Sequence, residues 1–254
     1  MQVDINCDMG ESFGAYRIGN DEEMMRYITS ANIACGYHAG DPMVMARTVK
    51  LAAEHGVQIG SHPGYPDLMG FGRRPMSLSQ DEIENYVLYQ MGALWAIAKA
   101  HKAEMRHVKP HGALGNLTFV DLEASRAVAR AIARFSKELI VYCLPGIPLV
   151  TAARELGLRV AEEFYPERGY CADGTLQPRK MPGSSIHDPK IALERAMRAV
   201  KEGVVIAYTG ETVKVRADSI CIHGDNPVAP EIAAALVGAL KAEGIQIKPA
   251  AEFL

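Results

Sequence analysis

Short apolar segments alternate with amphipathic ones along almost the whole chain. Apolar runs typical of buried strands occupy residues 3–7, 31–35, 57–60, 106–109, 139–144, 159–161, 219–223 and 245–248. Apolar residues at helical spacing occupy residues 21–27, 42–55, 79–102, 122–135, 148–156, 189–201 and 230–243. Such an alternation of strands and helices predicts a parallel α/β fold.

Several predicted helix boundaries carry the expected local signals. Asp41 and Pro42 are typical of a helix start, and Gly56 is typical of a helix end. Ser79 and Glu82 have the spacing of a capping box, in which each side chain bonds the backbone N–H of the other residue. These signals make the second and third predicted helices well bounded.

Two irregular segments, residues 64–78 and 163–187, interrupt the alternation. Long segments without regular structure inside a compact domain are usually lids or binding loops. Residues 204–215 predict a hairpin that turns at Gly210.

Polar and apolar side chains alternate in the first strand. Because successive side chains point to opposite faces, Asp4, Asn6 and Asp8 share one face, and Ile5 and Cys7 share the other. Three polar residues pointing into a barrel require hydrogen bonds or a ligand. The alternative is an exposed edge strand whose polar face lies in water.

The same alternation brings imidazole and ammonium groups to other strand ends. His38 and His62 follow the second and third strands in register. Lys109, the last residue of the fourth strand, shares a face with His111, and His223 ends a later strand. An open sheet concentrates its site at one switch point, whereas a barrel collects residues from most strand ends. The pattern therefore favours a TIM-like (β/α) barrel with seven or eight parallel strands.

Carboxylate, imidazole and ammonium groups at one rim suit acid–base chemistry, and a buried lysine can stabilise a developing oxyanion. The same groups can ligate a divalent metal, although no His-Glu-x-x-His pair makes such a site specific. Arg73 and Arg74 can hold a carboxylate or phosphate, with a solvated basic loop as the alternative. The sequence lacks a phosphate-binding loop, a nucleophile elbow and a dinucleotide fingerprint.

Composition limits the partners. The 254 residues are 48% hydrophobic and 22% charged with a net charge of −3, which is typical of a folded globular protein. This charge gives no reason to expect nucleic acid or an anionic membrane as a partner. The odd count of five cysteines and the absence of a signal-like start predict reduced thiols and a cytoplasmic location. The length fits a single barrel domain over residues 1–254.

Five motifs, occurring in order, resemble the LamB/YcsF family. They are Asp4–Glu11, Ala34–Asp41, Ser61–Asp67 with Gly70–Arg74, Val108–Leu114 and Cys221–Asp225. The resemblance extends from residue 2 to about residue 248. Two segments depart from the family pattern: Gly115 replaces a tyrosine, and Phe164–Arg168 is one residue longer and has Glu167 in place of an aspartate.

The resemblance implies a distorted (β/α) barrel related to glycoside hydrolases and polysaccharide deacetylases. It also implies ATP-dependent opening of 5-oxoproline to L-glutamate, with Mg²⁺ accompanying ATP and two further 5-oxoprolinase subunits, B and C, as partners. On this hypothesis the catalytic residues are Asp4, Asn6, Asp8, His38, His62, Lys109, His111 and His223, and the substrate-binding residues are Arg73, Arg74 and Asp225. We expect Asp8 or His62 to be the base.

Two other functions fit the same residues. One is a stand-alone metal-dependent carbohydrate deacetylase or amide hydrolase, which would hold stoichiometric zinc and act without partners. The other is a non-catalytic binding subunit, in which substitution of the histidines would weaken affinity without abolishing turnover.

Overall fold

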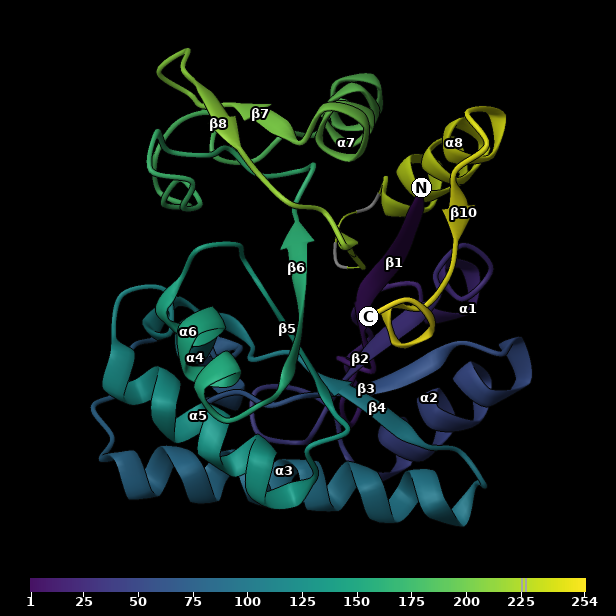
Figure 1. Ribbon diagram of the computed structural model, residues 1–254. Helices are drawn as coiled ribbons and strands as arrows, with labels where there is room; N and C mark the ends of the chain where they lie inside the picture. The colour runs from purple at the N-terminus through teal and green to yellow at the C-terminus, as the bar shows by residue number, and fades with distance from the viewer. Residues whose placement is uncertain (225, 227) are drawn as a thin grey trace.

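A closed ring of parallel strands forms the centre of the molecule (Figure 1). The computed structural model describes residues 1–224, 226 and 228–254, and Asp225 therefore lies outside the described residues. Within them, the ring consists of seven strands: β1 (Gln2–Met9), β2 (Ser30–Ala34), β3 (Gln58–His62), β4 (Met105–Val108), β5 (Ile140–Cys143), β6 (Arg159–Phe164) and β9 (Ser219–His223). The ring closes because β1 pairs with β2 and also with β9. The predicted TIM-like barrel is confirmed, with seven strands.

The eighth predicted strand lies outside the ring. It is β10 (Gln246–Ile247), which pairs with the first two residues of β1. Between β6 and β9 the chain leaves the barrel over residues 165–218, and these two strands pair only through Glu163 with Ser219 and Phe164 with Ile220. The predicted hairpin is present in this excursion as β7 (Val204–Ile206) and β8 (Thr212–Lys214).

Helices surround the barrel (Figure 1). They are α1 (Asp21–Met24), α2 (Pro42–His55), α3 (Gln80–Ala100), α4 (Gly112–Leu117), α5 (Leu122–Phe135), α6 (Pro148–Glu155), α7 (Pro189–Glu202) and α8 (Ala229–Ala242), with 3₁₀ turns η1 (Leu68–Gly70) and η2 (Ala250–Glu252). The Ser79–Glu82 capping box and the Asp41 cap are present as predicted. The sequence does not predict helix α4, because six residues are too few to establish a helical period.

The barrel separates apolar from polar side chains strand by strand. In β1, Ile5 and Cys7 belong to the main apolar core, while Asn6 bonds Ser219 on the neighbouring strand β9. His107 on β4 is buried with them and bonds Asn32. The edge-strand alternative is therefore wrong, because the polar face of β1 is buried and hydrogen-bonded.

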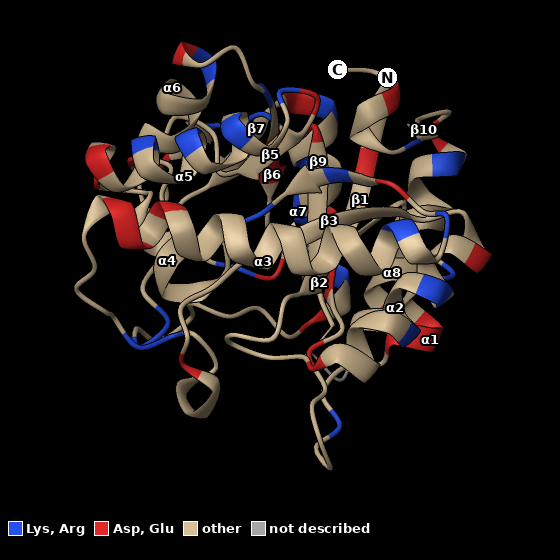
Figure 2. Cartoon of the chain, turned by 90° about the horizontal axis from the view of Figure 1, so that it is seen from below, with Lys and Arg blue, Asp and Glu red and all other residues tan. Residues whose placement is uncertain are grey.

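Charged residues of both signs occur on the helices around the barrel. Figure 2 shows basic and acidic residues interspersed over the helices, in keeping with the net charge of −3. Among the described residues, no helix combines the length and apolar character that a membrane crossing requires.

Candidate functional site

A cavity of about 680 Å³ opens among the carboxyl ends of the barrel strands and the following loops. Its inner wall carries five of the predicted residues: Asp8, His62, Lys109, His111 and His223. Its outer wall includes residues from the excursion after β6, such as Arg168 and Arg179. The excursion, part of which the sequence predicts to be a lid or binding loop, thus contributes directly to the cavity.

The ammonium of Lys109 is the most heavily coordinated group of this wall. Its Nζ lies 2.9 Å from Asp8 Oδ1 and 2.8 Å from Glu163 Oε1. It also lies 3.2 Å from Asn6 Oδ1 and 3.1 Å from Cys221 Sγ. Lys109 is 4% exposed, so these contacts replace the water that a charged amine normally holds.

Neighbouring charges of opposite sign determine the protonation states of Lys109 and Asp8. Burial opposes the charge of Lys109, but Asp8, Cys221 and Glu163 outweigh it and raise the Lys109 pKa well above its ordinary value. Burial also opposes the charge of Asp8, but the positive charge of His62 in its protonated form and the ammonium of Lys109 outweigh it and hold the Asp8 pKa well below its ordinary value. Both groups are therefore charged at neutral pH.

His62 connects this ion pair to a cluster of imidazoles. Its Nε2 lies 3.4 Å from Asp8 Oδ2 and 2.9 Å from His111 Nδ1. Its Nδ1 lies 2.7 Å from the backbone oxygen of Lys109. A carbonyl oxygen only accepts, so Nδ1 carries a proton, and in the neutral form of the ring the lone pair lies on Nε2.

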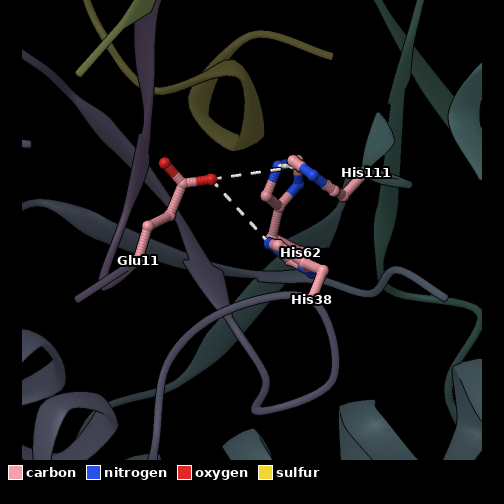
Figure 3. A group of neighbouring side chains, drawn as sticks. All are labelled: Glu11, His38, His62 and His111. Atoms are coloured by element: carbon pink, nitrogen blue, oxygen red, sulfur yellow. Dashed lines mark hydrogen bonds and ion pairs between the residues drawn. The ribbon is translucent and has the colours of Figure 1, made fainter. Parts of the chain in front are cut away.

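The rings of His38 and His111 stack, with centroids 3.7 Å apart. Figure 3 shows the Glu11 carboxylate beside both rings, with its Oε1 3.8 Å from His38 Nε2 and 4.0 Å from His111 Nδ1. Burial, strengthened by neighbouring imidazoles, lowers the pKa of His38 well below its ordinary value and that of His111 to about 3. Both rings are therefore neutral at pH 7.

A second imidazole–carboxylate pair reaches the cavity through His223, and its carboxylate partner Glu167 lies behind the lining residues. His223 Nδ1 lies 3.4 Å from Glu167 Oε2, and the same oxygen accepts a hydrogen bond from the His223 amide at 2.9 Å. Burial opposes the charge of Glu167, but the contacts with His223 outweigh it and lower the Glu167 pKa. The His223 ring also stacks on Tyr165.

Asp4 and Asn6 lie deeper in the barrel than the cavity wall. The Asp4 carboxylate accepts hydrogen bonds from the hydroxyls of Thr29, Ser30 and Ser219, while burial raises its pKa to about 6. Asn6 accepts from Lys109 and thereby positions it. Neither residue is among those that line the cavity.

The two arginines predicted to bind substrate, Arg73 and Arg74, lie in different surroundings. Arg73 lines the cavity. Arg74 instead donates from Nε to Asp67 Oδ1 at 2.8 Å, with a side chain that is 68% exposed, and it is not among the lining residues.

Sequence reasoning missed four acidic or aromatic residues of the site. They are Glu11, Glu163, Tyr165 and Glu167. The sequence does contain a signal for Glu163. If the sixth predicted strand is extended by three residues, alternation places the Glu163 side chain on the inward face, in register with Ser219. The positions of Glu11 and Glu167 depend on turns after the strands, which alternation does not describe.

Glycine permits the close packing of the imidazoles. Gly72 has a φ of +63°, and a Cβ there would lie 2.6 Å from His38 Cβ and 2.9 Å from His111 Cδ2. Gly146 provides a matched control, since it has a φ of +74° but a Cβ there would have no other atom within 4 Å.

We expect Gly146→Ala to lower the free energy of unfolding by about 1–2 kcal/mol through backbone strain alone. Gly72→Ala is expected to cost at least about 1 kcal/mol more, because the methyl group also displaces the rings. Urea denaturation of both variants measures the difference, and equal losses would contradict the packing role of Gly72.

Known proteins resemble this chain over its whole length. The sequence model of the LamB/YcsF family matches residues 3–254. The chain is 54% identical to the A subunit of 5-oxoprolinase from Pyrococcus abyssi and 52% identical to the protein of the same name from Pyrococcus furiosus, in each case over 254 residues and 100% of both chains. The crystal structure of a lactam utilization protein from Thermus thermophilus superposes with a TM-score of 0.93 at 49% identity, covering 98% of this chain and 99% of the other. The chain therefore belongs to the LamB/YcsF family.

Proposed function

We propose that this chain is the A subunit of an ATP-dependent 5-oxoprolinase and that its cavity opens the 5-oxoproline ring to give L-glutamate. The names of its relatives support a hydrolytic role on a lactam. The observation that carries the proposal is the buried Lys109 ammonium beside the Asp8–His62 pair on the inner cavity wall. None of these names supports the stand-alone deacetylase alternative.

Each charged group has a role in this proposal. The Asp8–His62 pair accepts a proton from the attacking water, with one member acting through the other. Lys109 offsets the negative charge that develops on the substrate. His223, held by Glu167, donates a proton to the departing ring nitrogen. Asp8, His62, Lys109 and His223 all line the same cavity, which supports this division of roles.

The order of bond cleavage follows from the chemistry. An unactivated lactam resists water, and transfer of the ATP γ-phosphoryl group to its oxygen makes the ring carbon electrophilic. Water then adds to that carbon, and the C–N bond must break before the C–O–phosphate link, because loss of phosphate first would regenerate the lactam. The resulting γ-glutamyl phosphate takes up a second water to yield glutamate and phosphate.

We assign ATP and its Mg²⁺ to the partner subunits B and C. The chain has no glycine-rich phosphate loop in its sequence, and its own groups are suited to proton transfer rather than to nucleotide binding. The isolated chain is therefore expected to show neither 5-oxoproline-dependent ATP hydrolysis nor deacetylation of N-acetylated sugars. Activity is expected only when both partners are added, and unaided hydrolysis of either substrate would contradict the assignment.

Arg73 is proposed to hold the substrate carboxylate. Replacing it by glutamine is expected to raise the KM for 5-oxoproline by about 10- to 100-fold, the value of one lost charge-assisted hydrogen bond. Arg74→Gln, which removes the contact with Asp67 instead, is expected to change KM less. Steady-state kinetics of the reconstituted complex measure both values, and a larger effect at Arg74 would contradict the assignment.

A further inference from the structure

One cluster beside the cavity has more nitrogen acceptors than donors to satisfy them. It consists of Glu11, His38, His62 and His111, called here the imidazole cluster, and it is shown in Figure 3. The side chains are at most 6% exposed. Of the four residues, His62 and His111 also line the cavity.

The backbone fixes the protons of two of these rings. His62 Nδ1 donates to the carbonyl oxygen of Lys109 at 2.7 Å, and His111 Nε2 donates to that of Phe71 at 2.8 Å. Neutral rings in these tautomers leave His62 Nε2 and His111 Nδ1 unprotonated, and these atoms are only 2.9 Å apart. Two lone pairs at this distance repel each other unless a cation or an extra proton lies beside them.

His38 adds a second, independent observation. The residue is fully buried, and neither of its ring nitrogens has a hydrogen-bond partner within the described residues. A buried polar group without a partner is destabilising, so such a group calls for a ligand that satisfies it. Its Nε2 points toward Glu11 Oε1, 3.8 Å away, across the space that His111 Nδ1 also faces.

We propose that the imidazole cluster binds a divalent transition-metal ion such as zinc through Glu11, His38, His62 and His111. Imidazole nitrogens with one carboxylate are a donor set that suits zinc and similar first-row ions, whereas magnesium and calcium prefer oxygen. The carbonyl groups that hold the outer nitrogens of His62 and His111 are the outer partners that metal-binding histidines usually have.

The spacing is compatible with such an ion. The four ligand atoms lie within 4.8 Å of one another. Ligands about 2.0–2.1 Å from a tetrahedral ion are about 3.3 Å apart, so His38 and Glu11 need to close by roughly 1 Å. The facing nitrogens of His62 and His111, 2.9 Å apart, need to separate by about 0.4 Å.

Binding of the ion would also determine which member of the Asp8–His62 pair accepts the proton from water. This consequence rests on the proposed function. With His62 Nε2 ligated, that nitrogen no longer accepts a proton. Asp8 Oδ2, 3.4 Å away, is then the acceptor of the pair. The ion site itself is inferred from the side chains alone and does not depend on the reaction.

Metal content of the isolated, tag-free chain tests the proposal. After dialysis against zinc or cobalt and removal of the excess, the wild-type chain is expected to hold about one ion. His62→Gln and His111→Gln are each expected to lower the affinity at least about tenfold. His107→Gln is the control, because His107 is equally buried but bonds Asn32 outside the cluster, and it is expected to retain the ion.

Circular dichroism and thermal melting separate loss of the ion from loss of the fold. In a folded variant, the visible absorption of bound cobalt is expected to disappear with the imidazole ligands. A wild-type chain that binds less than about a tenth of an equivalent of either metal would overturn the proposal, and so would full retention by His62→Gln and His111→Gln. Because no partner or substrate is present, these results are independent of whether the proposed ring opening is correct.

Discussion

Replacing Asp8 by asparagine is expected to lower the kcat for glutamate release by the reconstituted complex about 10²- to 10⁴-fold, the usual contribution of a general acid or base. Asparagine retains the shape and can still accept hydrogen bonds from Lys109 and Asn32. It cannot accept a proton or carry the charge that faces His62. The KM for 5-oxoproline is expected to change little, because the substitution removes a proton acceptor and leaves the cavity volume intact.

Steady-state kinetics at saturating ATP separate the two parameters. Glu54→Gln serves as the control, since Glu54 is an exposed carboxylate paired with Lys50 on α2. A near wild-type kcat with a raised KM would contradict a catalytic role and favour the non-catalytic binding subunit.

Replacing Lys109 by methionine is expected to give the largest loss of stability, about 3–5 kcal/mol in the free energy of unfolding, which is the usual cost of leaving a buried charge without its partner. Asp8 and Glu163 would both lose the ammonium, whose Nζ lies 2.9 Å and 2.8 Å from the two carboxylates. Urea denaturation measures the loss, and circular dichroism verifies that the variant starts folded.

Two further variants locate the cause of this loss. Lys50→Met removes an exposed ion pair of 3.7 Å and is expected to cost less than about 1 kcal/mol. Combining Lys109→Met with Glu163→Gln removes one of the two carboxylate charges left without a partner. The double variant is expected to recover part of the lost free energy of unfolding. A loss of similar size at Lys50, or no recovery in the double variant, would show that the buried charges are not responsible.

The alternation of side chains between the two faces of a strand predicts much of the site from the sequence. It indicates that Asp8, His62, Lys109, His111 and His223 come together, and all five line the cavity. The reason is geometric: in parallel strands, inward residues at the carboxyl ends meet at one rim of the barrel. The same rule cannot show how deep each residue lies, so it groups Asp4 with residues of the cavity wall although Asp4 bonds three hydroxyls below it.

Residues outside the regular strands are harder to predict. Glu11 and Glu167 reach the site from turns, whose paths depend on local backbone angles rather than on a repeating pattern. Arg73 and Arg74 illustrate the same limit, because adjacent loop residues point in different directions and only one of them lines the cavity. The fold itself is more predictable than the site, since every strand of the ring matches an apolar run.

The most direct test of the proposed function is glutamate release from 5-oxoproline and ATP by subunits B and C, measured with and without this chain. We expect rapid release only when the chain is present, and almost none when its Asp8→Asn form is supplied instead. Equal release without the chain, or at the wild-type rate with the Asp8→Asn form, would contradict the proposal that this barrel opens the lactam ring.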